Sequence, residues 1–133
     1  MKTTHHSAML LGASLVAASI LLSASGCLAV AAGAGAGAAV AYVRGDLEAP
    51  LDAGFERAVV AANRAVQELQ FAKVSEHKDA LLDLILARNA ADKKIEIRIE
   101  SESDRRTKLK IRVGLFGDEA LSMVILDRIK SGL

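Results

Sequence analysis

Residues 95–113, IEIRIESESDRRTKLKIRV, decide the fold of this chain. Apolar and charged residues alternate in both halves, with the apolar set formed by Ile95, Ile97, Ile99, Leu109, Ile111 and Val113. A period of two is typical of strands that bury one face. The polar residues 101–106 between the halves predict a turn. The stretch therefore predicts a hairpin in which an acidic-rich strand faces a basic one across opposite-charge pairs.

Two segments with helical spacing flank this hairpin in the sequence. The first is residues 55–69, with apolar residues three or four apart and Asp52 as its expected N-cap. Its apolar stripe is Phe55, Val59, Ala62, Val66 and Leu69. The second begins after Asp118, again an expected N-cap, and closes at Gly132. Its apolar stripe is Leu121, Val124, Ile125, Leu126 and Ile129.

Three further segments are expected to be strands. Residues 42–51 form a first strand ending near Pro50, and residues 71–76 form a second that stops at a turn over residues 77–79. Residues 80–90 are apolar in both registers and fit a strand or a three-turn helix. We prefer the strand, because the next segment needs a pairing partner. The fold class is then α+β, a two-layer sandwich whose antiparallel sheet carries two helices on one face in the order β-α-β-β-β-β-α.

Composition excludes several classes of protein. The chain has 133 residues, with 17 Lys and Arg against 16 Asp and Glu, which is too short for more than one ordinary domain. This balance argues against nucleic acid as a partner, since such binders carry a clustered basic surplus. The single cysteine excludes an internal disulfide and every multi-cysteine zinc site.

The N-terminus has the organisation of an export signal. Lys2 precedes an apolar stretch over residues 8–22 and a run of small residues over 24–26, so residues 1–26 are expected to be a signal peptide. Residues 22–27, LSASGC, resemble the lipobox of bacterial lipoproteins. That resemblance implies cleavage between Gly26 and Cys27 and lipidation of Cys27. The alternatives are an uncleaved membrane span, for which about 20 apolar residues suffice, a core thiol or a reactive thiol.

A low-complexity tether follows the cysteine. Residues 27–43 contain Gly33, Gly35 and Gly37 alternating with alanine, which suits a flexible or membrane-skimming spacer before a domain at residues 44–133. A phosphate-binding loop is the alternative, although no GxxxxGK[ST] motif is present. By resemblance to lipoproteins of Gram-negative bacteria, Leu28 in place of Asp implies anchoring in the outer membrane, facing the periplasm.

Several motifs together resemble a known family. The lipobox, the GAGAGAA run, YVRGDLEAPLD, the charged hairpin and GLFGDEALSMVILDRIKSGL are similar to small bacterial lipoproteins described only as a domain of unknown function. That family has no established activity to transfer. The element order is also loosely similar to helix-grip domains, which enclose apolar ligands.

The candidate chemistry is sparse. His77 is the one histidine beyond the signal peptide, and capping explains Asp118 in the adjacent Asp118–Glu119 pair. We therefore expect no enzyme, no catalytic residue, no cofactor and no metal. The expected function is a membrane-anchored interaction or structural module, whose partner is a second copy or another envelope protein. The alternative is a carrier of a small apolar ligand or lipid.

Two sets of residues would separate these functions. Exposure of the row Leu82, Leu84 and Leu86 favours an interaction module. A closed cavity favours the carrier. Its expected lining is Val59, Val66, Ile97 and Ile111.

Overall fold

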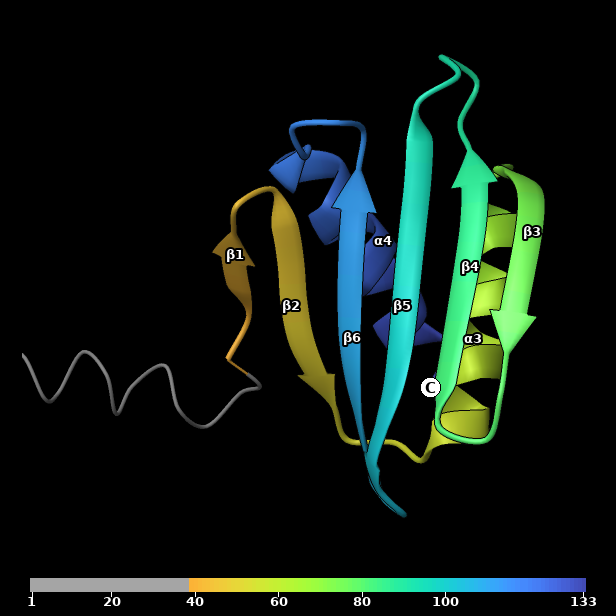
Figure 1. Ribbon diagram of the computed structural model, residues 1–133, viewed down its shortest axis with the longest axis vertical. Helices are drawn as coiled ribbons and strands as arrows, with labels where there is room; N and C mark the ends of the chain where they lie inside the picture. Colours follow the sequence, from red (N-terminus) through yellow and green to blue (C-terminus); the bar gives the residue numbers. More distant parts are fainter. Residues whose placement is uncertain (1–38) are drawn as a thin grey trace, which may run out of the picture. The chain divides into compact units, whose positions relative to one another are not determined.

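The computed structural model describes residues 39–133. Six antiparallel strands form one sheet in the order β1-β2-β6-β5-β4-β3 (Figure 1). The strands are β1 (Ala41–Val43), β2 (Asp46–Leu51), β3 (Ala72–Lys78), β4 (Leu82–Arg88), β5 (Lys94–Ser103) and β6 (Arg106–Val113), and the helices are α3 (Phe55–Glu68) and α4 (Glu119–Ser131). The chain is therefore α+β with a large share of strand, as the sequence predicts.

The hairpin of β5 and β6 lies in the middle of the sheet and confirms the reading of residues 95–113. All six of its alternating apolar side chains are buried. The turn is shorter than expected: β5 continues to Ser103 and β6 begins at Arg106, so only residues 104 and 105 lie between them. Thr107, which the alternation also points inward, is buried and donates its hydroxyl to the carbonyl oxygen of Ala53 at 2.7 Å.

The prediction of a single strand over residues 42–51 is wrong. β1 and β2 form a hairpin in this segment, and Arg44 and Gly45 are its two turn residues, with φ of 54° and 87°. Two positive φ angles are what a type I′ hairpin turn requires. Pro50 lies beyond the end of β1 and pairs only with Lys108 of β6, so its missing N–H costs no bond to β1.

Strand β4 confirms the preferred reading of residues 80–90, but the turn predicted at residues 77–79 is wrong. β3 continues through His77 to Lys78. The reversal comes at residues 79–81, where the carboxylate of Asp79 accepts the backbone N–H groups of Leu81 and Leu82 at 3.0 and 2.9 Å. This local bond turns the chain at Asp79.

Helix α3 has the predicted stripe but not the predicted cap. Gly54 occupies the N-cap position, and no side chain caps the helix, so the role expected of Asp52 is wrong. A Cβ at Gly54 would lie 2.7 Å from the carbonyl oxygen of Asp104; the tip of the β5–β6 hairpin thus leaves room only for glycine. Alanines outside the stripe, Ala58, Ala61 and Ala65, are also buried.

Helix α4 begins and ends as predicted. Asp118 is its N-cap and accepts the backbone N–H of Leu121 at 3.0 Å, while Gly132 is its C-cap. Ile125, Leu126 and Ile129 are buried. Val124 is exposed, so its place in the buried stripe is wrong.

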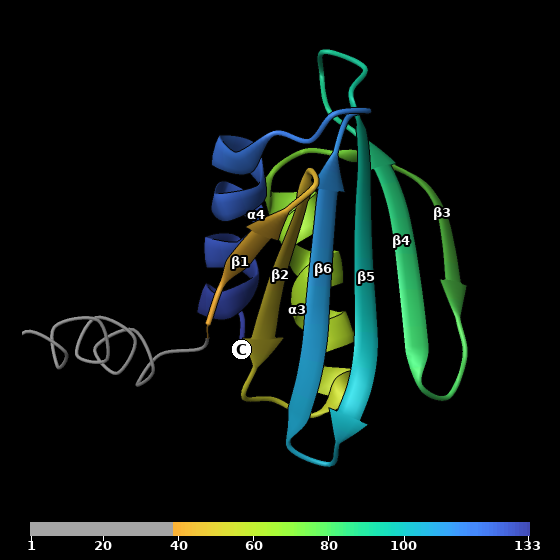
Figure 2. The same cartoon turned by 60° about the vertical axis from the view of Figure 1, so that its left-hand side comes forward.

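Both helices lie behind the sheet in Figure 1, and the turned view of Figure 2 agrees. Their buried side chains belong to one apolar core with the inward-facing residues of β2, β4, β5 and β6. The outward-facing residues of these strands are half-buried and mostly charged. Within residues 39–133, no helix is long and apolar enough to cross a membrane.

Candidate functional site

Two of the motifs quoted above, YVRGDLEAPLD and the start of GLFGDEALSMVILDRIKSGL, meet at one end of the sheet. The β1–β2 turn, Arg44–Gly45, lies against the loop Gly114–Gly117 that joins β6 to α4. We call this pair of segments the turn–loop corner. A Cβ on Gly45 would lie 2.5 Å from the carbonyl oxygen of Phe116, and one on Gly117 would collide with the Tyr42 hydroxyl and the Gly45 backbone. Both glycines are needed for this approach.

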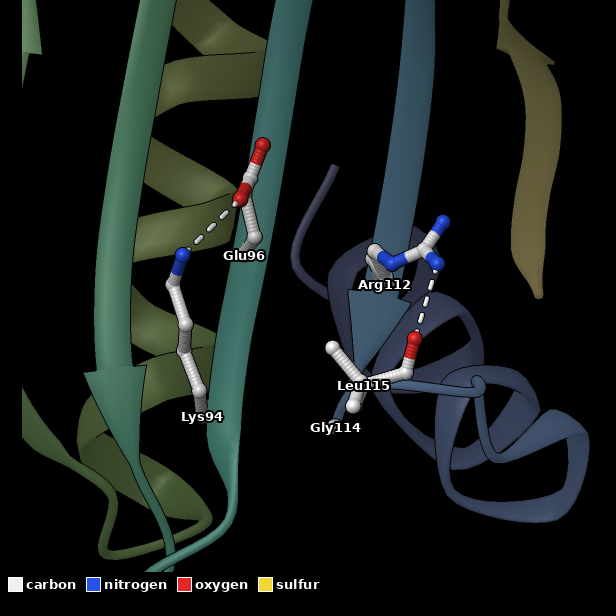
Figure 3. A pocket seen from close by; sticks show the side chains of 5 residues that line it. All are labelled: Lys94, Glu96, Arg112, Gly114 and Leu115. Atoms are coloured by element: carbon white, nitrogen blue, oxygen red, sulfur yellow. Dashed lines mark hydrogen bonds and ion pairs between the residues drawn. The ribbon is translucent and has the colours of Figure 1, made fainter.

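Arg112, near the end of β6, binds both segments of the corner, and Figure 3 shows its bond to Leu115. Its guanidinium donates to the carbonyl oxygens of Arg44 at 3.3 Å and Leu115 at 2.9 Å, and to the carboxylate of Asp46 at 2.8 Å. Burial by itself would raise the pKa of Asp46, but bonds to Lys110 and Arg112 outweigh it and lower that pKa. The corner is thus fixed by a charge-assisted network.

The corner exposes two large apolar side chains. Leu115 is 78% exposed and Phe116 is 88% exposed. Beside Leu115 lies a shallow hollow of about 340 Å³, lined by Lys94, Glu96, Arg112, Gly114 and Leu115. Lys94 and Glu96, two residues apart on β5, form an ion pair of 3.4 Å on one side of the hollow, as Figure 3 shows. The charged side chains of this hollow are held in ion pairs, Lys94 with Glu96 and Arg112 with Asp46.

Most basic residues of β6 are neutralised by a strand other than the one predicted. The register places Glu96 and Glu100 opposite Arg112 and Lys108, but β6 has one ion pair with β5, between Arg106 and Glu102 at 3.8 Å, and its other ion pairs run to β2. Lys108 and Lys110 each lie 3.4 Å from Glu48. Lys110 and Arg112 lie 3.0 and 2.8 Å from Asp46. The expected absence of a basic nucleic-acid patch stays a prediction, and these pairs favour it.

Asp83 is a buried carboxylate that the sequence pattern did not predict. It lies on β4 between Lys78 of β3 and Ile99 of β5, is fully buried, and neither of its carboxylate oxygens has a hydrogen-bond partner among residues 39–133. Burial is the main cause that raises the pKa of Asp83 from 3.8 to about 6, and the negative charge of Glu76 is the second cause. One signal could have revealed it: Asp83 stands in the same register as Ile85 and Ala87, which face the core.

A charged cluster covers Asp83 from β3 and α3. Lys73 and Glu76 of β3 form an ion pair of 2.7 Å, and both bind the amide of Asn63 on α3, at 2.8 and 2.7 Å. These bonds, first that from Lys73, lower the pKa of Glu76. Lys78 reaches Glu56 of α3 at 2.7 Å. The cluster therefore holds its negative charge on Glu76, beside the carboxyl of Asp83.

The structure places the remaining predicted site residues as follows. Gly26 and Cys27 lie outside the described residues, as do Gly33, Gly35 and Gly37. His77 lies on the exposed strand β3. Asp118 caps α4 and also pairs with Lys93 at 2.9 Å, and these bonds, first that from Lys93, lower its pKa. Over residues 39–133, no group of three or more His, Cys, Asp and Glu side chains is placed to hold a metal ion.

The residues expected to line a carrier cavity are packed together instead. Each of the four is at most 5% exposed, and all belong to the apolar core. They are Val59, Val66, Ile97 and Ile111. The row Leu82, Leu84 and Leu86 is half-buried on the side of β4 opposite Ile85. The leucine row is not fully exposed, so the choice between an interaction surface and a ligand cavity stays a prediction.

Comparison with known families gives one match. The model of a family described as "Protein of unknown function (DUF3568)" matches residues 9–132. No match was found among curated proteins. The matched region includes the apolar N-terminal segment, the Gly/Ala run and both segments of the turn–loop corner.

Proposed function

Because the chain belongs to this family of proteins of unknown function, its role has to be inferred from its own residues, and we propose that it is a lipid-anchored cell-envelope protein. Its folded part acts as a non-enzymatic interaction or structural module that faces the periplasm. The turn–loop corner carries this proposal. It is held rigidly, it displays apolar side chains, and it contains no group suited to catalysis.

The proposed organisation has three parts. Residues 1–26 are a signal peptide removed at Gly26, Cys27 carries the lipid, and residues 28–43 lead to the folded domain. That domain is a two-layer sandwich, with the sheet as one layer and the helices as the other. The family match begins at residue 9, inside the apolar segment, which supports a shared role for the N-terminus beyond the folded domain.

Several observations favour binding over catalysis. Acid–base catalysis needs titratable groups within reach of a substrate. Asp83 has a raised pKa but is fully buried. His77 lies on edge strand β3, which β4 separates from the residues of β5 that line the hollow beside Leu115, and it is not among the lining residues. The carrier alternative needs an apolar cavity, and its expected lining residues all belong to one buried apolar cluster.

Metabolic labelling with palmitate tests the anchor. We expect the wild-type protein to incorporate the label, because two or three acyl chains on Cys27 make membrane attachment effectively permanent. Cys27→Ser should abolish the label and accumulate uncleaved precursor. Ser25→Ala is the matched control, since it keeps a small residue before the cleavage site and should label normally. Equal labelling of Cys27→Ser would refute the lipid anchor.

Fractionation tests the proposed location. The labelled wild-type protein should sediment with the outer membrane, and Leu28→Asp should move it to the inner membrane. If the wild-type protein sediments with the inner membrane, or if Leu28→Asp changes nothing, the assignment from Leu28 is wrong. Palmitate incorporation by both proteins separates a failure of sorting from a failure of lipidation.

A further inference from the structure

The exposed pair at the tip of the turn–loop corner differs from the other exposed apolar residues of the domain. Leu115 and Phe116 are neighbours in the chain, and at 78% and 88% they are more exposed than Leu81, at 65%, or Val60, at 66%. Isolated exposed apolar residues are common on soluble proteins and need no explanation. Two adjacent ones at the tip of a fixed loop form a small apolar projection.

The projection is rigid before it meets any partner. Arg112 binds the carbonyl oxygen of Leu115, and the backbone of Phe116 lies against Gly45. Gly114 donates its N–H to the carbonyl oxygen of Lys94 at 2.7 Å. A loop fixed in this way loses little conformational entropy on binding, so most of the free energy from burying its apolar side chains remains available.

The position of the tether indicates which surface the projection meets. The tether enters the domain through β1, and the hydroxyl of Tyr42 on that strand lies beside Gly117. Figure 1 shows β1 running directly up to the corner. The chain between Cys27 and Tyr42 can span up to about 50 Å when fully extended. A lipid on Cys27 would therefore hold the corner within reach of the bilayer.

We propose that Leu115 and Phe116 insert into the interfacial region of the lipid bilayer and orient the domain on it. The proposal rests on the lipid anchor inferred above. Three cations around the corner are paired: Lys94 with Glu96, Arg112 with Asp46, and Lys93 with Asp118. The exposed Arg44 of the turn has no ion pair among the described residues. The contact is therefore mainly apolar, and it does not require anionic lipids.

A single tryptophan tests the insertion, because the chain has no natural one. The mature lipidated protein carrying Phe116→Trp is purified from membranes and reconstituted into phosphatidylcholine vesicles with brominated acyl chains. We expect the tryptophan emission to lie at a shorter wavelength than that of the same protein denatured in the absence of detergent. We also expect the bromine atoms to quench this emission. Neither signal should change when phosphatidylglycerol is added or the salt concentration is raised.

Leu81→Trp is the matched control. Leu81 is exposed in the β3–β4 turn, at the opposite edge of the sheet from β1 and at the other end of the strands (Figure 1). Its tryptophan should stay red-shifted and unquenched on the same vesicles. Circular dichroism should show that both variants keep the wild-type fold, since both positions lie outside the core.

Flotation of the vesicles separates the two proposals. Protein that floats with the vesicles but shows no quenching at Phe116→Trp, or equal quenching at Leu81→Trp, overturns the inserted loop and leaves the anchor intact. Protein that does not float overturns the anchor and the loop together. A photoreactive phenylalanine at position 116 that crosslinks in cells to a protein instead of lipid would also overturn the insertion, in favour of a protein partner.

Discussion

Asp83 places an ionisable group in the core of the domain, and its replacement by Asn should have an effect that depends on pH. The carboxyl is fully buried, and its oxygens have no hydrogen-bond partner among the described residues. Asn has nearly the same shape and cannot ionise. We expect Asp83→Asn to stabilise the protein at neutral pH relative to the wild type, and this gain to disappear as the solution is acidified.

The magnitude follows from the pKa of Asp83. Burial is the main cause that raises it from 3.8 to about 6, and the negative charge of Glu76 is the next. A raised pKa means that the folded state holds the proton more tightly than the unfolded state. The free energy of unfolding is therefore highest below the unfolded pKa and falls as the pH rises through about 6. The total fall is about 3 kcal/mol, at about 1.4 kcal/mol for each pKa unit.

Asp79→Asn is a control of opposite sign with the same chemical change. Hydrogen bonds from backbone N–H groups lower the pKa of Asp79. The bond from Leu81 has the largest effect and the bond from Leu82 the next. A lowered pKa contributes stability above the unfolded value and loses it as the pH falls through the folded value. Asp79→Asn should therefore destabilise the protein at neutral pH, with a smaller effect in acid. The two substitutions should show opposite trends with pH.

The assay is urea unfolding of a chain of residues 39–133, monitored by far-ultraviolet circular dichroism. It is repeated from about pH 4 to about pH 7.5, the range over which the titration of Asp83 changes the free energy of unfolding. The difference in free energy of unfolding between Asp83→Asn and wild type should grow by about 3 kcal/mol across it. Carboxyl NMR of Asp83 gives its pKa independently. A difference that stays constant with pH, or a titration of Asp83 near 3.9 as in model peptides, would refute the reasoning.

Three further predictions follow from the sheet and the corner. Ile97→Asp should abolish cooperative unfolding, because an unpaired buried charge costs several kcal/mol, whereas Arg98→Asp should cost less than about 1 kcal/mol; both are read from urea titrations. Gly117→Ala should lower the free energy of unfolding by about 1–3 kcal/mol in the same assay, because the φ of Gly117 is 89° and the Gly45 backbone leaves no room for a Cβ. Gly114→Ala should lower it less, because the φ of Gly114 is unfavourable but a Cβ there would meet no other atom. Leu84→Lys should leave the fold intact and remove self-association in sedimentation; a monomeric wild type at high micromolar concentration, or an unfolded variant, would contradict this.

Local sequence patterns predicted most of the fold. The alternation over residues 95–113 and the stripe over residues 55–69 report which side of a strand or helix is apolar, and burial in the structure follows them. The β1–β2 hairpin was not predicted, because β1 has only three residues, too few to show an alternating pattern. Its turn is Arg44–Gly45 rather than the Asn-Gly or Asp-Gly pair that marks such hairpins most strongly.

The candidate site could not be predicted from the sequence for a different reason. Arg112 links Asp46 to the carbonyl oxygen of Leu115, and the pairing of β2 with β6, which no local pattern specifies, brings these groups together. The motifs at residues 42–52 and 114–119 could be recognised separately, but not as neighbours. Asp83 was hidden because both registers of its segment are mostly apolar, which drew attention to the leucines instead.

The edges of the sheet limit how the domain can associate. An exposed edge strand can pair with a strand of another chain unless charges or irregular geometry prevent it. β3 is exposed along its whole length, carries Lys73, Glu76 and Lys78, and has an irregular register between Lys73 and Ser75. β1, at the other edge, has only three residues. Association through strand pairing is therefore disfavoured. The open face of the sheet around Leu84 and the tip of the turn–loop corner are therefore the candidate surfaces for the contacts proposed above.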